Sequence, residues 1–168
     1  MSSYKENSYI LYWKASFNEL LSEALIKKWS RFDTATKFIS LITISGSAFA
    51  GWFLWTTVEG KYIWSLIAVV VSIVSAANTT MKVPDRIKEW EERRGESSKL
   101  ARSIESFRRL LNISNDDHQI KTEYTNLENK WTYGATLFKN TDILITDKLS
   151  NEVKKQVNQN IEEGRYNK

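Results

Sequence analysis

Uncharged residues form two long stretches near the middle of the chain, residues 38–58 and 62–81, separated by Glu59-Gly60-Lys61. A helix rises about 1.5 Å per residue, so each stretch extends ~30 Å as a helix, the thickness of the hydrocarbon core of a bilayer. A three-residue link forces two such helices to run antiparallel. The pattern therefore predicts a transmembrane helical hairpin.

Upstream of the first stretch, apolar residues recur at helical spacing and predict an amphipathic helix. These residues are Ile10, Trp13, Phe17, Leu20, Leu21, Ala24 and Leu25. We expect Ser8 to cap the helix, which then either ends near Lys28 or continues into the first stretch. The apolar face has two alternative roles, which are packing against the C-terminal helices and contact with the inner leaflet.

Downstream, Pro84 predicts a helix break or a first-turn position, because proline lacks an N–H group and disfavours helix in the residue before it. Three further helices are predicted, with a turn of capping residues at 114–117 between the first two. Their apolar positions are Ile87, Trp90, Leu100, Ile104, Phe107, Leu110 and Leu111, then Ile120, Tyr124, Leu127, Trp131, Gly134 and Phe138, then Leu149, Val153, Val157 and Ile161. Only residues 143–145 resemble a strand.

We therefore expect an all-α protein with a transmembrane helical hairpin and a cytosolic helical bundle. Its parts are an N-terminal amphipathic cytosolic helix over 1–36, the hairpin over 37–82 and a cytosolic helical region over 83–168. The second helical segment after Pro84 has heptad spacing, which favours side-by-side helix packing. We expect the interface of the bundle to be formed by Ile104, Phe107, Leu127 and Trp131.

Basic residues cluster at the two ends of the predicted hairpin that lie away from its turn. They are Lys27, Lys28, Arg31 and Lys37 before it and Lys82, Arg86, Lys88, Arg93 and Arg94 after it. The positive-inside rule predicts a multi-pass protein of the inner membrane with both termini cytoplasmic and Gly60 exposed outside. Aromatic residues are expected at the two interfaces: Trp52, Trp55, Tyr62 and Trp64 near the turn, and Trp29 and Phe32 at the inner side.

The composition offers little for catalysis, because the chain has no cysteine and His118 is its only histidine. His118 lies in a polar turn, which indicates a surface residue. The six glycines are scattered, so no phosphate-binding loop is predicted. We expect no enzyme activity, no metal site, no cofactor and no nucleic-acid partner.

Small residues form a stripe along one face of each predicted transmembrane helix. They are Ser40, Thr43, Ser47 and Ala50 in the first stretch, and Ser65, Ala68, Ser72, Ser75 and Thr79 in the second. Small residues allow close helix packing, and hydroxyl groups form hydrogen bonds between helices. The alternative is that they line a water path. Two helices cannot enclose a pore, so that alternative requires a homo-oligomer.

The sequence Leu25-Ile26-Lys27-Lys28-Trp29-Ser30-Arg31-Phe32 leads from the amphipathic helix into the first stretch. With the tight hairpin and the long helical region after it, this layout resembles the SLATT domains over roughly residues 8–140. These are bacterial two-transmembrane proteins that associate with synthases and sensors of nucleotide second messengers in antiphage defence. The resemblance implies a pore-forming effector, a nucleotide-second-messenger sensor or synthase as partner, and no catalytic residues.

The resulting hypothesis is an oligomeric effector that permeabilises the lipid bilayer when triggered, causing growth arrest or death. A membrane-anchored adaptor that recruits a soluble partner through its cytosolic helices is the first alternative. A holin-like protein is the second, although the size of the cytosolic part argues against it.

Overall fold

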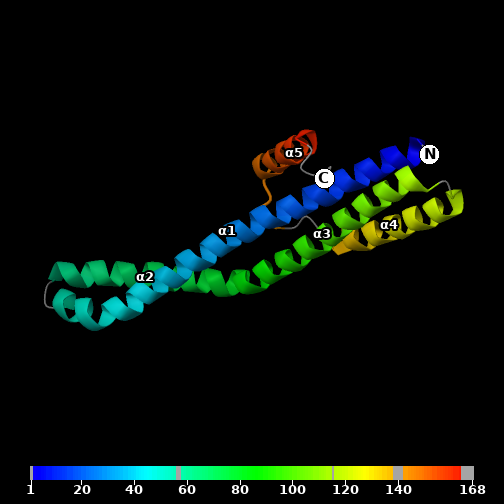
Figure 1. Ribbon diagram of the computed structural model, residues 1–168. Coiled ribbons are helices and arrows are strands. Elements are labelled where there is room, and N and C mark those ends of the chain that lie inside the picture. Colours follow the sequence, from blue (N-terminus) through cyan, green and yellow to red (C-terminus); the bar gives the residue numbers. More distant parts are fainter. Residues whose placement is uncertain (1, 56–57, 115, 138–141, 164–168) are drawn as a thin grey trace. The chain divides into compact units, whose positions relative to one another are not determined.

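The computed structural model describes residues 2–55, 58–114, 116–137 and 142–163, and their side chains in 3–41, 59–114, 116–134 and 142–163. The described residues form α1 (Ser2–Trp55), α2 (Val58–Met81), α3 (Val83–Ile113), α4 (Asp117–Leu137) and α5 (Asp147–Glu162) (Figure 1). None of them lies in a strand, and residues 143–145 belong to a short connection before α5. The expected all-α class is confirmed.

The chain divides into two compact units. Unit 1 contains Met1–Ile26 and Glu89–Lys168, and unit 2 contains Lys27–Lys88. The helix α1 runs without a break from Ser2 to Trp55, so the amphipathic helix continues into the first uncharged stretch. The predicted boundary at 36 therefore lies inside α1, whereas the one at 82 falls at the break between α2 and α3.

Ser8 is not the N-cap of α1, because the helix begins six residues earlier at Ser2. The hydroxyl group of Ser8 is buried and donates a hydrogen bond to the carbonyl of Lys5 (2.8 Å). One reason is tertiary: Tyr4 packs against the core of unit 1 and its ring lies 5.2 Å from that of Tyr124. This contact keeps the first turns helical where the local sequence offers an alternative start.

In unit 2, the break between α2 and α3 lies at Lys82, whose φ of 48° is left-handed. A left-handed residue commonly ends a helix, although lysine is rarely found there. Its N–H donates to the carbonyl of Thr79 (3.2 Å), and its carbonyl accepts from the N–H of Arg86 (3.0 Å). Pro84 lies in the first turn of α3, where its missing N–H costs nothing, so the prediction for Pro84 is confirmed.

The predicted link of residues 59–61 is wrong, because these residues are helical and belong to the first turn of α2. Glu59 is favourable there, since a negative charge near a helix N-terminus interacts well with the helix dipole. Gly60 is buried, and the expectation that it is exposed is also wrong. Glu59 and Lys61 are the exposed residues of this turn.

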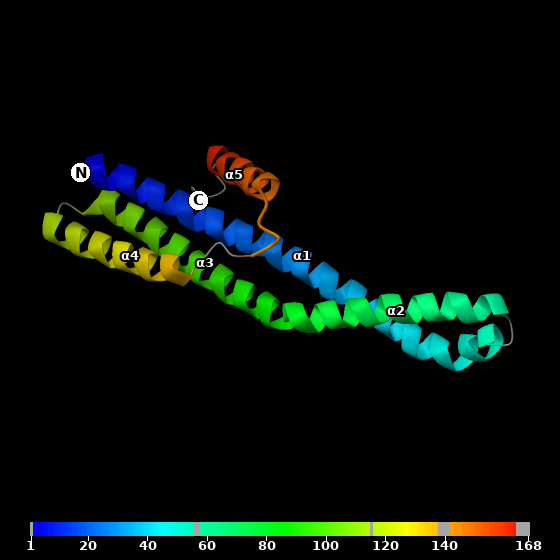
Figure 2. The same cartoon turned by 180° about the vertical axis from the view of Figure 1, so that it is seen from behind.

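In unit 1, the N-terminal half of α1 lies beside α3 and α4 in both views (Figures 1 and 2). Tyr12 of α1 donates a hydrogen bond to Glu105 of α3 (3.2 Å), and Glu23 forms an ion pair with Arg94 (3.3 Å). Residue numbers rise along α1 as they fall along α3, so these helices are antiparallel. They enclose one core together with α4: Leu11, Tyr12, Ala15, Ala101, Ile104, Phe107, Leu111, Ile120, Tyr124 and Leu127.

The buried face of α1 matches the predicted apolar stripe only in part, at Leu21 and Leu25. Ile10 is 44% exposed, whereas Leu11, Tyr12 and Ala15 are buried in the core. Three serines, Ser8, Ser16 and Ser22, are also fully buried. Small side chains let helices approach closely, so serines occupy a face that a hydropathy pattern assigns to larger apolar residues. The core contacts favour the packing role of this face.

The last helix, α5, buries Leu149, Val153 and Val157 as its apolar spacing predicts. Two tryptophan N–H groups form hydrogen bonds with the segment that contains α5. Trp90 donates to Oδ2 of Asp142 (2.7 Å) in a buried hydrogen bond, and Trp13 donates to Oδ1 of Asn158 (2.8 Å) in an exposed one. Both bonds join residues far apart in the sequence, and they place α5 within unit 1.

The turn between α3 and α4 contains the expected cap. Oδ1 of Asp116 accepts hydrogen bonds from the backbone N–H groups of His118 (2.9 Å) and Gln119 (3.2 Å), which is the geometry of an N-cap. The side chain of His118 is exposed, as expected for a surface residue.

Candidate functional site: the exposed surface of α2

The candidate functional surface is the apolar helix α2. Within the described residues, one helical stretch, Glu59–Ile113, contains a segment long and apolar enough to cross a membrane, judged by length and composition. The uncharged part of that stretch is 62–81, which belongs to α2. None of the most apolar window is buried inside the chain. Other parts of the described chain therefore do not cover this window.

Large apolar side chains project from α2 without a protein cover. Leu66 is 68% exposed and Ile73 is 63% exposed. Further exposed apolar side chains of α2 are Tyr62, Ile63, Ile67, Val69, Val70 and Met81, and Phe38, Ile39 and Leu41 are exposed on α1. Monomeric soluble proteins rarely expose contiguous apolar patches of this extent, so such a surface marks contact with lipid or with another protein.

The small-residue stripe of α2 is also exposed, at Ser65, Ala68, Ser72, Ser75 and Thr79. Three of its hydroxyl groups donate to the carbonyl one turn earlier: Ser65 to Lys61 (2.9 Å), Ser72 to Ala68 (2.8 Å) and Thr79 to Ser75 (3.0 Å). Each donor is satisfied within the helix, so the stripe tolerates a membrane without a partner. Its small side chains also leave room for the close approach of another helix.

The first-stretch stripe is described only in part. Ser40 is half-buried on α1. Thr43, Ser47 and Ala50 belong to α1, but their side chains lie outside the described residues. Trp52 and Trp55, two members of the predicted aromatic group near the turn, also belong to α1, and their side chains lie outside the described ones as well. The other two members lie on α2, with Tyr62 exposed and Trp64 half-buried.

The predicted interfacial role of Trp29 is wrong, because its ring is buried in the protein. Phe32, whose ring meets that of Trp29 edge-on at 6.2 Å, is exposed. An indole has a large apolar surface, so protein contacts compete with the lipid interface for it. Of this pair, only Phe32 is exposed.

Unit 2 also contains two buried oxygen atoms that lack a hydrogen-bond partner in the described structure, Oδ1 of Asp33 and Oδ1 of Asn78. The other carboxylate oxygen of Asp33 pairs with Lys37 at 2.6 Å. Buried acceptors without a partner are uncommon and raise the energy of the isolated chain. Neither buried oxygen was predicted from the sequence, although the spacing of four between Asp33 and Lys37 is the signal of a helical ion pair.

The residues predicted for the bundle interface come together in unit 1. Ile104, Phe107 and Leu127 are buried in its core, and Trp131 packs against it partly buried. The ammonium group of Lys14 on α1 lies 5.7 Å from the centre of the Trp131 ring, a cation–π contact. Burial, together with a hydrogen bond to Glu128, raises the pKa of the nearby Tyr124 to about 12.

Within the described residues, no group of three or more histidine, cysteine, aspartate or glutamate side chains is placed to hold a metal ion. A comparison with protein-family models found no match, and neither the curated proteins nor the solved structures gave one. The functional argument therefore rests on the surface of α2 and on the helical bundle of unit 1.

Proposed function

We propose that this chain is an inner-membrane protein whose copies associate through α2 and permeabilise the bilayer. The observation that carries the proposal is the exposure of two faces of an uncharged helix, one with large apolar side chains and the other with the small-residue stripe, in which three hydroxyl groups bond within the helix. The face with large apolar side chains is proposed to contact lipid. A second copy suits the stripe, because interfaces between membrane helices are rich in small residues.

In the proposed topology, residues 38–55 of α1 and residues 62–81 of α2 cross the membrane as an antiparallel hairpin. Lys27, Lys28, Arg31 and Lys82 are exposed at the ends of these segments, which supports a cytoplasmic location for both termini. At the turn end of the hairpin, the opposite charges of Glu59 and Lys61 leave no net charge. Unit 1 then lies in the cytoplasm and contains the bundle.

A single hairpin cannot enclose a water path, so permeabilisation requires several copies. The hydroxyl groups of Ser65, Ser72 and Thr79 bond to their own helix, and each oxygen retains acceptor capacity that water can use. The proposed setting in antiphage defence, with a nucleotide-second-messenger sensor or synthase as partner, rests on the resemblance in layout to the SLATT domains.

The stripe is tested by Ser72→Leu, with Val70→Leu as the matched control. Val70 is exposed and lies two residues from Ser72, so it projects from the opposite side of the helix. Dye leakage is measured from liposomes that contain the purified chain, and subunits are counted by crosslinking. We expect Ser72→Leu to abolish leakage and Val70→Leu to leave it unchanged.

The oligomer count separates the two roles of the stripe. Lost leakage with intact oligomers supports a lining role, because leucine fills the path with apolar bulk. Lost leakage with lost oligomers supports a packing role, because leucine prevents close approach of the helices. A wild-type chain that never leaks and stays monomeric at high protein-to-lipid ratio contradicts the proposal and favours the adaptor.

The topology is tested by cysteine labelling, since the chain contains no cysteine of its own. Gly60 is buried, so Lys61→Cys is the better external probe, with Ser3→Cys and Lys154→Cys as exposed internal probes. An impermeant maleimide applied to intact cells should label Lys61→Cys and neither of the other two. The opposite pattern refutes the proposed orientation.

The membrane-anchored adaptor remains the second candidate. It is favoured by unit 1, whose ranges Met1–Ile26 and Glu89–Lys168 make up more than half of the chain. An adaptor recruits a partner through the surface of that unit and leaks dye in no variant. A holin-like function has no comparable support, because holins need little structure outside the membrane.

A further inference from the structure

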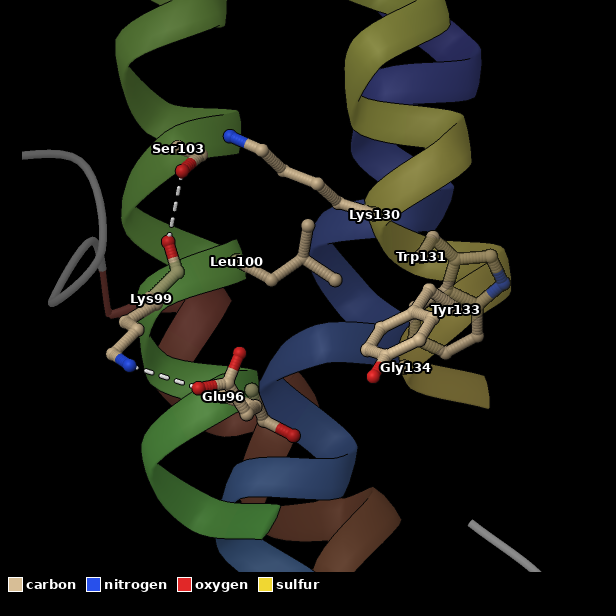
Figure 3. Close-up of a pocket in the computed structure, with 9 residues that line it drawn as sticks. Glu96, Lys99, Leu100, Ser103, Lys130, Trp131, Tyr133 and Gly134 are labelled. Atoms are coloured by element: carbon tan, nitrogen blue, oxygen red, sulfur yellow. Dashed lines mark hydrogen bonds and ion pairs between the residues drawn. The ribbon is translucent and has the colours of Figure 1, made fainter. Parts of the chain in front are cut away.

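A cavity of about 230 Å³ lies in unit 1 between α3 and α4 (Figure 3). Both walls come from bundle helices. The lining residues are Glu96, Ser97, Lys99, Leu100, Ser103, Lys130, Trp131, Tyr133 and Gly134. One water needs only about 10–15 Å³ of such space, and sites for drug-sized ligands have about 300–1,000 Å³. The cavity therefore suits a small organic molecule.

The middle of the cavity is mainly apolar. Figure 3 shows Leu100 extending from α3 toward the space that Tyr133 borders on the α4 side, with Trp131 next to Tyr133. An aliphatic wall opposite aromatic rings accommodates a planar ring, which gains from stacking and from burial. Gly134 leaves space beside them, since no heavy atom lies within 4 Å of a Cβ built on it.

The two ends of the cavity differ in charge. Figure 3 shows Lys130 reaching from α4 toward Ser103 of α3 at one end, with Glu96 at the other. Glu96 pairs with Lys99 at 2.8 Å, so its charge is compensated. Within the described residues, no carboxylate lies within ion-pair distance of Lys130. One uncommitted ammonium group thus makes the Lys130 end attractive to an anion.

A second and independent observation is Ser97. This residue is 3% exposed, and its Oγ has no hydrogen-bond partner in the described structure. The other cavity serine, Ser103, donates to the carbonyl of Lys99 (3.0 Å), as helical serines commonly do. A buried hydroxyl without a partner is unfavourable, so a polar atom of a bound molecule would stabilise it.

We propose that this cavity binds a small aromatic carboxylate, with its ring between Leu100 and Tyr133 and its carboxylate toward Lys130. One ammonium group without an ion-pair partner matches a single negative charge better than a phosphate with two. Ser97 supplies a further polar contact for the ligand. The inference goes beyond the proposed permeabilisation and holds whether or not the chain conducts.

The first test uses the full chain in phosphatidylcholine nanodiscs and the probe 5-fluoroindole-3-acetate, followed by ¹⁹F NMR. The matched neutral probe is 5-fluoroindole-3-acetamide. We expect the acid to bind with at least about tenfold higher affinity than the amide, because only the acid pairs with Lys130. Equal affinities, or no line broadening with the acid at millimolar concentration, overturn the proposal.

The second test fills the cavity. Gly134→Leu places a side chain in the open space and should abolish binding of the acid. Gly95→Leu is the matched control, because Gly95 is also a helical glycine with nothing within 4 Å of a built Cβ, but it does not line the cavity. Neither variant should lower the melting temperature, since leucine favours helix over glycine. Retained binding in Gly134→Leu contradicts the site.

The third test addresses the polar groups. Lys130→Gln should weaken binding of the acid about tenfold and leave binding of the amide unchanged, whereas Lys121→Gln, an exposed lysine of the same helix, should change neither. Ser97→Ala should weaken acid binding severalfold without lowering the melting temperature. If Lys130→Gln weakens both probes equally, the charge assignment fails. Acid binding by a chain that never leaks would refute the proposed permeabilisation alone.

Discussion

The sharpest test of the bundle is Phe107→Ala in α3. Phe107 is 4% exposed, and its ring centre lies 5.9 Å from that of Tyr124 on α4. Truncating a buried phenylalanine to alanine typically costs about 3–5 kcal/mol. Contacts between two aromatic rings contribute about 0.5–1.5 kcal/mol beyond burial of their area, and the rings of Phe107 and Tyr124 meet at a tilt of 46°. The free energy of unfolding of a folded domain is only about 5–15 kcal/mol, so this single change should destabilise the whole of unit 1.

The matched control is Ile113→Ala on the same helix. Ile113 is 83% exposed, so its truncation should change stability by no more than about 0.5 kcal/mol. Phenylalanine and isoleucine both gain helix propensity on becoming alanine, by less than about 0.7 kcal/mol each. The difference between the two variants therefore isolates the burial of Phe107.

The measurement is hydrogen–deuterium exchange of the full chain in nanodiscs, with peptides from α1, α3 and α4. When exchange follows the opening equilibrium, a loss of about 3 kcal/mol increases the exchange rate roughly 100-fold, because about 1.4 kcal/mol corresponds to a factor of ten. Peptides of all three helices should respond together in Phe107→Ala. A rate within about threefold of Ile113→Ala would refute the idea that these helices share one core.

Two further predictions concern unit 1. Because burial and the hydrogen bond to Glu128 raise the pKa of Tyr124 from 10.0 to about 12, the folded state holds its proton more tightly than the unfolded state. Stability should be unaffected below pH 10 and fall by about 2–3 kcal/mol as the pH rises from 10 to 12. Denaturation curves at several alkaline pH values test this, and Tyr124→Phe should lose this part of the pH dependence; an equally steep decline in that variant would exclude Tyr124 as its source. Trp90→Phe removes a buried hydrogen bond to Asp142 and should speed protease cleavage before α5, because a hydrogen bond to a charged group contributes about 1.5–3 kcal/mol. Trp13→Phe, which removes only the exposed bond to Asn158, is the control, and equal cleavage of the two variants would show that the buried bond has no special role.

Sequence spacing predicted the helices well where apolar residues repeat with a helical period and larger residues fill the buried positions. This holds for α4 and α5, where Ile120, Tyr124, Leu127, Leu149 and Val153 are all buried. On α1 the spacing succeeded only in part: Leu21 and Leu25 are buried, whereas Ile10 is exposed and serines take buried places. A hydropathy pattern detects which residues prefer burial, and it cannot detect where helices come close enough to require small ones.

The two candidate sites also differ in how far the sequence predicts them. The apolar character of α2 and its small-residue stripe follow from the order of residues alone, because a run of 20 uncharged residues fixes both length and periodicity. The cavity between α3 and α4 was not foreseen, since its lining combines residues 96–103 with residues 130–134. Only the antiparallel packing of two helices brings those two segments together.

By itself, the sequence determined the all-helical class, the break at Lys82 and Pro84, the cap at Asp116 and the presence of an apolar helix from Tyr62 to Met81. These are local properties, because they depend on backbone geometry and on the periodicity of neighbouring residues. The tertiary structure alone decided that α1 continues unbroken from Ser2, that Trp29 is buried, and that Trp90 bonds to Asp142. Each of these depends on contacts between residues far apart in the chain, whose free energy outweighs the local preference at either end.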